Sequence, residues 1–193
     1  QDKTLSAVFL GNSTISTDQG GGIYTYGNDT GTALFRSNGS FDIFGSSLAE
    51  DGTDTIQTFC REYHYEDLIF GLDKTGTGTA IATRYYNDNP VFNCSVTFTL
   101  ENGVLSRVSG TYLPSSSSEV NTVAPLSAVA ALTTFLDMRL ESGSVASVIT
   151  DMYLCYELQS TTASPMTLTP CWCIVTDTSN FYVNCVTSAV LSE

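Results

Sequence analysis

The chain has 193 residues, of which 42% are hydrophobic and 11% aromatic, which is enough for a packed core and excludes a disordered chain. Twenty acidic and seven basic residues give a formal net charge of −13, which excludes nucleic acid and an anionic membrane surface as expected partners. No apolar run reaches the roughly 18 residues of a membrane helix, and we expect any membrane anchor to have been removed with a segment before Gln1.

Residues 1–50 are predicted to form a short N-terminal β extension, a partial unit rather than a full repeat. Asn12–Gly22 is rich in Ser, Thr and Gly and is typical of a loop. Two short strands are expected on either side of Gly27–Gly31. Asn38-Gly39 then favours a tight turn into the next strand, because both positions tolerate positive φ angles.

Residues 51–114 are predicted to form a first repeat that begins with a helix near Asp54–His64. Asp54 followed by Gln57 has the spacing of a capping box, which satisfies free amides at a helix start. One apolar stripe at helical spacing follows, formed by Ile56, Phe59, Cys60 and Tyr63. Antiparallel strands are expected to complete this repeat.

The strand Val91–Leu100 alternates strictly between apolar and polar residues, which is typical of an antiparallel sheet with one buried and one wet face. Its polar face is the predicted binding surface, because small polar groups interleaved with aromatic residues favour protein contact. That surface comprises Asn93, Ser95, Thr97 and Thr99, with Trp172 expected nearby. An ordinary solvated sheet face explains the same residues equally well.

Residues 115–193 are predicted to form a second repeat after a Pro114–Ser118 linker. Its helix, around Leu126–Leu140, is expected to turn one face to the core, formed by Leu126, Val129, Ala130, Thr133, Leu136 and Leu140, with Leu132 and Phe135 widening it. A closing hairpin follows, and its Pro170-Cys171-Trp172 matches Pro90-Val91-Phe92 of the first repeat. The predicted fold class is therefore α+β, with two tandem repeats of a helix packed on an antiparallel sheet, together forming one compact unit.

Six cysteines would permit three disulfides in an oxidising compartment, but a chain of this size does not need them, and we favour buried free thiols. Cys171 and Cys173, with Cys185 on the adjoining strand, could offer three thiolates to a soft metal. A strand spacing of two holds such a pair apart, so no metal site is predicted. A disulfide from this pair to Cys185 ranks between buried free thiols and a metal site.

Two residue sets could be catalytic. Asp29-Thr30-Gly31-Thr32 matches the tetrapeptide of aspartic peptidases, but no second copy exists, and a turn explains the same residues. Cys60 and His64 lie four apart on the first helix and could form a thiol–imidazole pair, but Cys60 lies on the apolar stripe. We therefore predict a protein without enzymatic activity or cofactor, and a hydrolase using either set is the less favoured alternative.

Several segments together resemble the PepSY-type fold and, more particularly, the YycI and YycH extracytoplasmic regulatory proteins of Gram-positive bacteria. The resemblance rests on the helix-plus-sheet repeat, the Glu101-Asn102-Gly103 turn, and Asn87–Phe92 and Pro170–Asn184 with their prolines and aromatic residues. It implies a membrane-anchored, extracytoplasmic module that modulates a membrane sensor histidine kinase of a two-component system, or contacts its accessory protein. PepSY-type domains also imply an alternative, a peptidase-inhibitory module.

Overall fold

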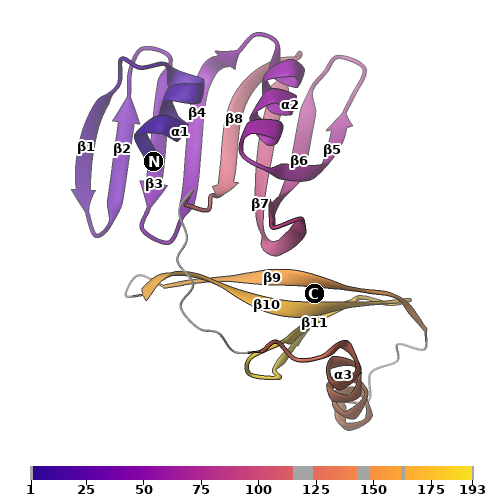
Figure 1. Ribbon diagram of the computed structural model, residues 1–193. Helices are drawn as coiled ribbons and strands as arrows, with labels where there is room; N and C mark the ends of the chain where they lie inside the picture. Colours follow the sequence, from indigo (N-terminus) through magenta and orange to yellow (C-terminus); the bar gives the residue numbers. More distant parts are fainter. Residues whose placement is uncertain (1, 115–123, 143–147, 162–163, 193) are drawn as a thin grey trace. The chain divides into compact units, whose positions relative to one another are not determined.

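The computed structural model describes residues 2–114, 124–142, 148–161 and 164–192 (Figure 1). Its helices are α1 (Asp2–Leu10), α2 (Gly52–Glu62) and α3 (Ala128–Ser142). The strands are β1 (Ile15–Gly20), β2 (Ile23–Gly27), β3 (Gly31–Arg36), β4 (Ser40–Ala49), β5 (Tyr65–Leu72), β6 (Gly78–Tyr86), β7 (Asn89–Glu101), β8 (Val104–Thr111), β9 (Ile149–Thr161), β10 (Ser164–Thr176), β11 (Asn180–Asn184) and β12 (Val190–Ser192).

The chain divides into two compact units, and strand β7 contributes to both. The first unit comprises Gln1–Tyr85, Asn93–Ser116 and Ser160–Met166. The second comprises Tyr86–Phe92, Ser117–Gln159 and Thr167–Glu193. No described helix has both the length and the apolar content that a membrane crossing requires.

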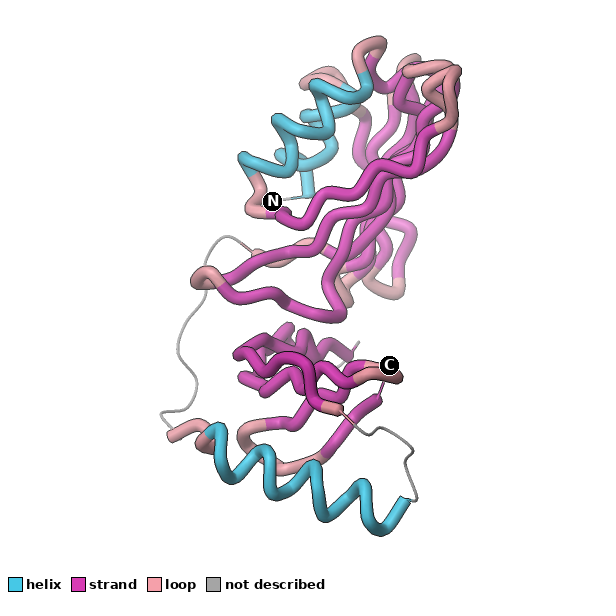
Figure 2. Tube along the Cα trace, turned by 90° about the vertical axis from the view of Figure 1, so that its right-hand side faces the viewer, coloured by secondary structure: helices cyan, strands magenta, loops and turns pink. Residues whose placement is uncertain are grey.

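The first unit is an antiparallel sheet with α1 and α2 on one face, and Figure 2 shows both helices on one side of the strands. Its strand order is β1-β2-β3-β4-β8-β7, with β6 next to β7 and β5 next to β6. The helices bury Leu5, Phe9, Ile56 and Phe59 against inward-facing strand residues, which include Phe35, Ile43, Val96, Phe98 and Val108. Burial of these side chains is the main stabilising term for this unit.

The N-cap of helix α2 lies three residues before the N-cap that the sequence predicted. Asp51, rather than Asp54, is the N-cap, and its carboxylate accepts a hydrogen bond from the Asp54 amide at 3.1 Å. This bond satisfies one of the amides that have no partner within the helix. The predicted apolar stripe is confirmed at Ile56, Phe59 and Cys60, which are buried.

The second unit contains strands β9, β10, β11 and β12, with α3 packed on β11 and β12. Val91, at the start of β7, pairs in parallel with Tyr156 of β9 within this unit. One core cluster joins α3 to the sheet through Ala131, Phe135, Ile174, Phe181 and Val183. A second cluster comprises Cys155, Cys171, Cys173 and Tyr182, with Phe92 stacked on the Tyr182 ring at 3.8 Å.

The predicted fold class is wrong. Among the described residues, hydrogen bonding links twelve strands into one mixed sheet, with three short helices, instead of two tandem helix-on-sheet repeats. The N-terminal β extension is wrong too, because β3 and β4 lie inside this sheet, with Phe35 and Ile43 fully buried. Strand β4 pairs with β8, far along the chain, and local periodicity carries no information about such partners. The domain boundaries after residues 50 and 114 stay predictions.

Three local predictions also need correction or fall outside the described residues. Residues Asn12–Gly22, expected to be a loop, contain strand β1. Helix α3 exists where it was predicted, and its core face is partly the predicted one: Phe135 is buried, whereas Leu140 is 83% exposed and the buried Ala131 was not predicted. The predicted linker Pro114–Ser118 lies outside the described residues apart from its proline.

Candidate functional site

The open face of the first unit is the face of its sheet that α1 and α2 leave uncovered. On β7, Val96 and Phe98 point to the core, so Thr97 and Thr99 point to the open face. Strand pairing extends this face into two neighbouring rows of residues. One row is Thr17, Thr25, Leu34, Asp42, Ser109 and Thr97, and the next is Ile15, Gly27, Thr32, Phe44, Arg107 and Thr99.

An ion pair lies in the middle of the open face. The Arg107 guanidinium donates to both carboxylate oxygens of Asp42, with Nε–Oδ1 at 2.9 Å and Nη2–Oδ2 at 2.6 Å. These bonds and the carboxylate charge raise the pKa of Arg107. Beside the pair, the Phe44 ring is 48% exposed. The face therefore combines hydroxyl groups, one aromatic ring and a fixed pair of opposite charges.

The structure places four of the five predicted binding residues together. Asn93 and Ser95 are exposed, and Thr97 and Thr99 are half-buried along β7. Trp172 belongs to the second unit, where its Nε1–H donates to the Leu126 carbonyl oxygen at 2.8 Å and its ring packs against the α3 core. These contacts give Trp172 a structural role.

Sequence reasoning missed Asp42, Phe44 and Arg107. The signal for the first two was present, because Phe41 and Ile43 are buried and alternate with them along β4. The pairing of Asp42 with Arg107 spans 65 residues, and no local pattern indicates it.

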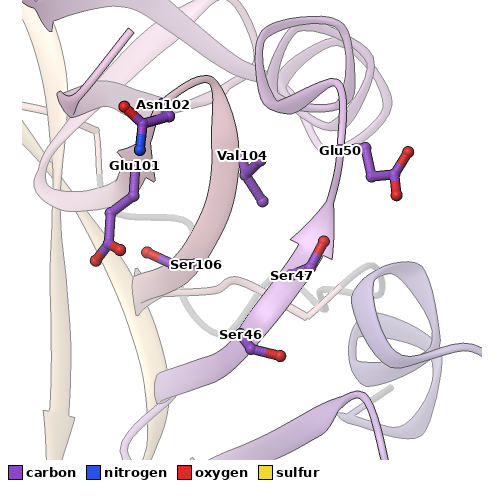
Figure 3. A pocket seen from close by; sticks show the side chains of 7 residues that line it. All are labelled: Ser46, Ser47, Glu50, Glu101, Asn102, Val104 and Ser106. Atoms are coloured by element: carbon purple, nitrogen blue, oxygen red, sulfur yellow. The ribbon is translucent and has the colours of Figure 1, made fainter. Parts of the chain in front are cut away.

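A pocket opens beside this face where β4 bulges away from β8 (Figure 3). Phe44 pairs with Arg107, and the next pair is Ala49 with Leu105, so residues 45–48 of β4 face only one residue of β8. Gly45, at the start of the bulge, lets β4 lie close to β3, because a Cβ there would collide with the Thr30 carbonyl oxygen. The pocket has a volume of about 520 Å³ and is lined by Ser46, Ser47, Glu50, Glu101, Asn102, Val104 and Ser106.

The pocket suits hydrogen bonding to a polar or cationic group better than catalysis. Ser46 and Ser47 lie across the opening from Val104 and Ser106, and the carboxylates of Glu50 and Glu101 point away from each other at its rim. The residues that line it include no histidine or cysteine to activate a serine hydroxyl. We therefore treat the pocket as an extension of the open face.

Asp29 lies in a turn between β2 and β3. The side chain of Asn28 forms this turn, since its Oδ1 accepts from the amides of Thr30 and Gly31 at 2.9 and 3.3 Å. Its Nδ2 donates to the Leu10 carbonyl oxygen at 2.6 Å and ties the turn to α1. This local geometry explains the Asn-Asp-Thr-Gly sequence without a catalytic role.

Cys60 and His64 have opposite surroundings. Cys60 is 4% exposed in the main core, whereas His64 is exposed, with a φ of 55°. The His64 carbonyl oxygen accepts from the Tyr85 amide at 2.9 Å and from the Arg84 guanidinium at 3.0 Å. Burial raises the pKa of Cys60 to about 11, which is the reverse of what a nucleophilic thiol needs.

We expect the free energy of unfolding to fall as the pH rises from about 9 towards 12, because burial raises the thiol pKa of Cys60 to about 11 and of Cys94 to about 12. The thiols of the unfolded chain ionise first, near 9, so the stabilisation is complete below that pH and is lost as the pH passes the folded values. Urea titrations at a series of pH values measure this. Cys60→Ala/Cys94→Ala is expected to flatten the loss, and an unchanged pH dependence in that variant would contradict the assignment.

All six cysteines are buried, and the structure joins none of them in a disulfide. Four of them, Cys155, Cys171, Cys173 and Cys185, lie in the second unit. Within the described ranges, no three or more His, Cys, Asp or Glu side chains are grouped so that they could hold a metal ion.

No protein-family model matches the chain, and no curated protein matches it significantly. One solved structure with a match is the Bacillus megaterium YpeB C-terminal domain, which is 10% identical, with 99% of this chain and 95% of that chain covered and a TM-score of 0.48. At this identity and TM-score, neither the fold nor the function of this chain follows from it.

Proposed function

We propose that this protein is a non-enzymatic binding module that acts through protein contacts on the open face of its first unit. The observation that carries the proposal is the combination of the exposed Phe44 ring, the Arg107–Asp42 ion pair and the Thr97 and Thr99 hydroxyls on one side of one sheet. Aromatic residues and arginine are enriched in protein interfaces. The formal charge of −13 favours a partner with a neutral or basic surface.

The more specific form of the proposal is an extracytoplasmic regulator of a membrane sensor histidine kinase in a two-component system. Its support is the resemblance of the Pro170–Asn184 segment and the Glu101-Asn102-Gly103 turn to the YycI and YycH proteins. The expected partner is then the kinase or its accessory protein, with a membrane anchor outside this chain.

Peptidase inhibition is the second candidate. It requires only the coarser PepSY-type resemblance and an accessible surface, so it makes fewer assumptions than kinase regulation. It predicts that the purified chain lowers the turnover of a target peptidase on mixing. A hydrolase using Asp29 or the Cys60/His64 pair would become credible only if Asp29→Asn or Cys60→Ala abolished an observed turnover.

Affinity capture on solubilised membranes of the source organism, with the immobilised chain, tests the proposal. The key variant is Thr97→Glu/Thr99→Glu, which adds two negative charges to the open face without touching the core. Thr53→Glu/Thr58→Glu is the matched control, because it adds the same charges to exposed positions of α2 on the covered side. We expect the open-face variant to lose at least about tenfold in affinity for the captured protein, since carboxylates that an interface buries without a partner are costly.

The identity of the captured protein separates the two specific forms. A histidine kinase or its accessory protein supports the regulatory form. A peptidase that the wild-type chain inhibits, and that the open-face variant does not, supports the inhibitory form. Equal binding by the open-face variant and the α2 control would show that the open face is not the interface.

A further inference from the structure

Strand β5 forms one edge of the sheet of the first unit. Within the part of the chain that the structure describes, β6 is its one pairing partner, and Figure 1 shows β5 at the end of the sheet. An edge strand carries backbone N–H and C=O groups that point away from the sheet and can pair with another strand. The bulge between Glu66 and Ile69 leaves Ile69–Leu72 as the regular part of this edge.

Phe70 and Leu72 turn their backbone N–H and C=O groups away from β6. The Asp73 amide donates to the Thr77 carbonyl oxygen at 2.9 Å, one step beyond the pair of Leu72 with Gly78. Hydrogen-bonded and non-hydrogen-bonded pairs alternate along antiparallel strands. The backbone of every second residue before Asp73 therefore bonds to β6, and the backbone groups of Phe70 and Leu72 face outward.

The side chains of this edge leave part of the core open. Leu68, Phe70 and Leu72 pack against the core cluster under α1 and α2 but are only half-buried. On the opposite face of the strand, Ile69 is 71% exposed. A further strand would cover both sets of side chains, because paired residues of neighbouring strands share a face. Strand β1, the other edge of this sheet, has all six residues exposed and offers no such row of half-buried apolar residues.

The charges around this edge favour a basic segment. Glu66 and Asp67 precede its regular part, Asp73 follows it, and all three are exposed. Lys74 is the one basic residue in positions 66–78 of the sequence. Complementary charges at the ends of an incoming segment would fix its position along the edge.

We propose that β5 binds an extended segment of a partner protein, with alternating apolar residues and basic residues at its ends, as an added antiparallel strand. Antiparallel pairing matches the rest of this unit and is slightly more stable per residue than parallel pairing. In strand addition, backbone hydrogen bonds provide affinity and alternate side chains provide specificity. This edge is separate from the open face, so the proposal goes beyond the proposed function and does not depend on it.

Nuclear magnetic resonance titration of the isotopically labelled chain tests strand addition. The probe is a peptide of alternating valine and threonine residues between terminal lysines. At up to about 1 mM peptide, we expect the amide resonances of Phe70 and Leu72 to shift most. The valines are expected to lie opposite these two residues, on the side of the core, with their N–H groups donating to β5.

Methylation of the peptide nitrogens tests the pairing without altering the protein. Methylation of the valine nitrogens removes the donors to β5 and is expected to weaken binding at least about tenfold. Methylation of the threonine nitrogens is the matched control, and it is expected to leave binding unchanged, because those N–H groups point to solvent. Parallel pairing would reverse this pattern, so the reverse result would overturn the antiparallel arrangement.

A matched pair of edge variants tests the location. Ile69→Lys is expected to weaken binding several-fold, because it places a cation beside the basic peptide on β5. Ile15→Lys makes the same change at a position of β1 that is 79% exposed, and it is expected to have a much smaller effect. The open-face variant Thr97→Glu/Thr99→Glu is expected not to weaken binding. Absence of shifts at β5, or equal binding by the peptide with methylated valine nitrogens, would overturn the proposal.

Discussion

Phe59→Ala is expected to lower the free energy of unfolding of the first unit by about 3–5 kcal/mol, the range for removing a buried phenylalanine ring. Phe59 is 1% exposed and lies at the centre of an aromatic cluster. Its ring centroid is 5.3 Å from Phe9, 4.7 Å from Tyr63, 5.7 Å from Tyr65 and 5.6 Å from Phe98. Removal of the Phe59 ring would leave a cavity between α1, α2 and the sheet. The surrounding rings are packed against other core residues and cannot move in to fill it.

Phe44→Ala is the matched control, since it removes the same side chain from the open face. With its ring 48% exposed, we expect a loss below about 1 kcal/mol. Urea unfolding followed by far-UV circular dichroism measures both variants. Because Trp172 is the only tryptophan and lies in the second unit, its fluorescence shows whether that unit unfolds separately. Equal losses for Phe59 and Phe44 would contradict the assignment of the two sheet faces.

The covered and open faces of this sheet also show how much of the structure could be predicted from the sequence alone. The alternation along Val91–Leu100 predicted the strand and both of its faces, and the structure confirms that Cys94, Val96, Phe98 and Leu100 are fully buried. Such alternation is a local property of one strand, so it can be read directly. The ion pair between Asp42 and Arg107 depends on the pairing of β4 with β8, which only the folded sheet defines.

The same limit explains the error in the fold class. Helices α2 and α3 are visible as periodic apolar stripes, and they suggested two copies of one unit. Strand β1 has all six of its residues exposed, and its Ser, Thr and Gly content is typical of a loop. Residues 15–20 form a strand because they pair with β2 at the edge of a large sheet. The intrinsic strand propensities of these residues do not include the stabilisation from that pairing.

Helix α3 shows a different limit, because it is apolar on two opposite sides. Val129, Leu136 and Leu140 form one stripe, and Ala131 and Phe135 belong to the other. Periodicity identifies the helix but cannot choose between two stripes of equal period. The sequence-based prediction centred the core face on the longer stripe, with leucines at both ends and Phe135 only at its margin, and the sheet of the second unit packs against the stripe that contains Phe135.

Phe135→Ala tests that choice, and its expected effect is as large as that of Phe59→Ala. Phe135 is 1% exposed and packs against Phe181, so its removal is expected to lower the free energy of unfolding of the second unit by about 3–5 kcal/mol. Trp172 reports this loss directly, because it packs in the same cluster. Leu140→Ala, on the exposed stripe of the same helix, is expected to change the stability of the monomer by no more than about 0.5 kcal/mol. A large loss for Leu140→Ala and a small one for Phe135→Ala would instead place the longer stripe of α3, Val129, Leu136 and Leu140, against the core.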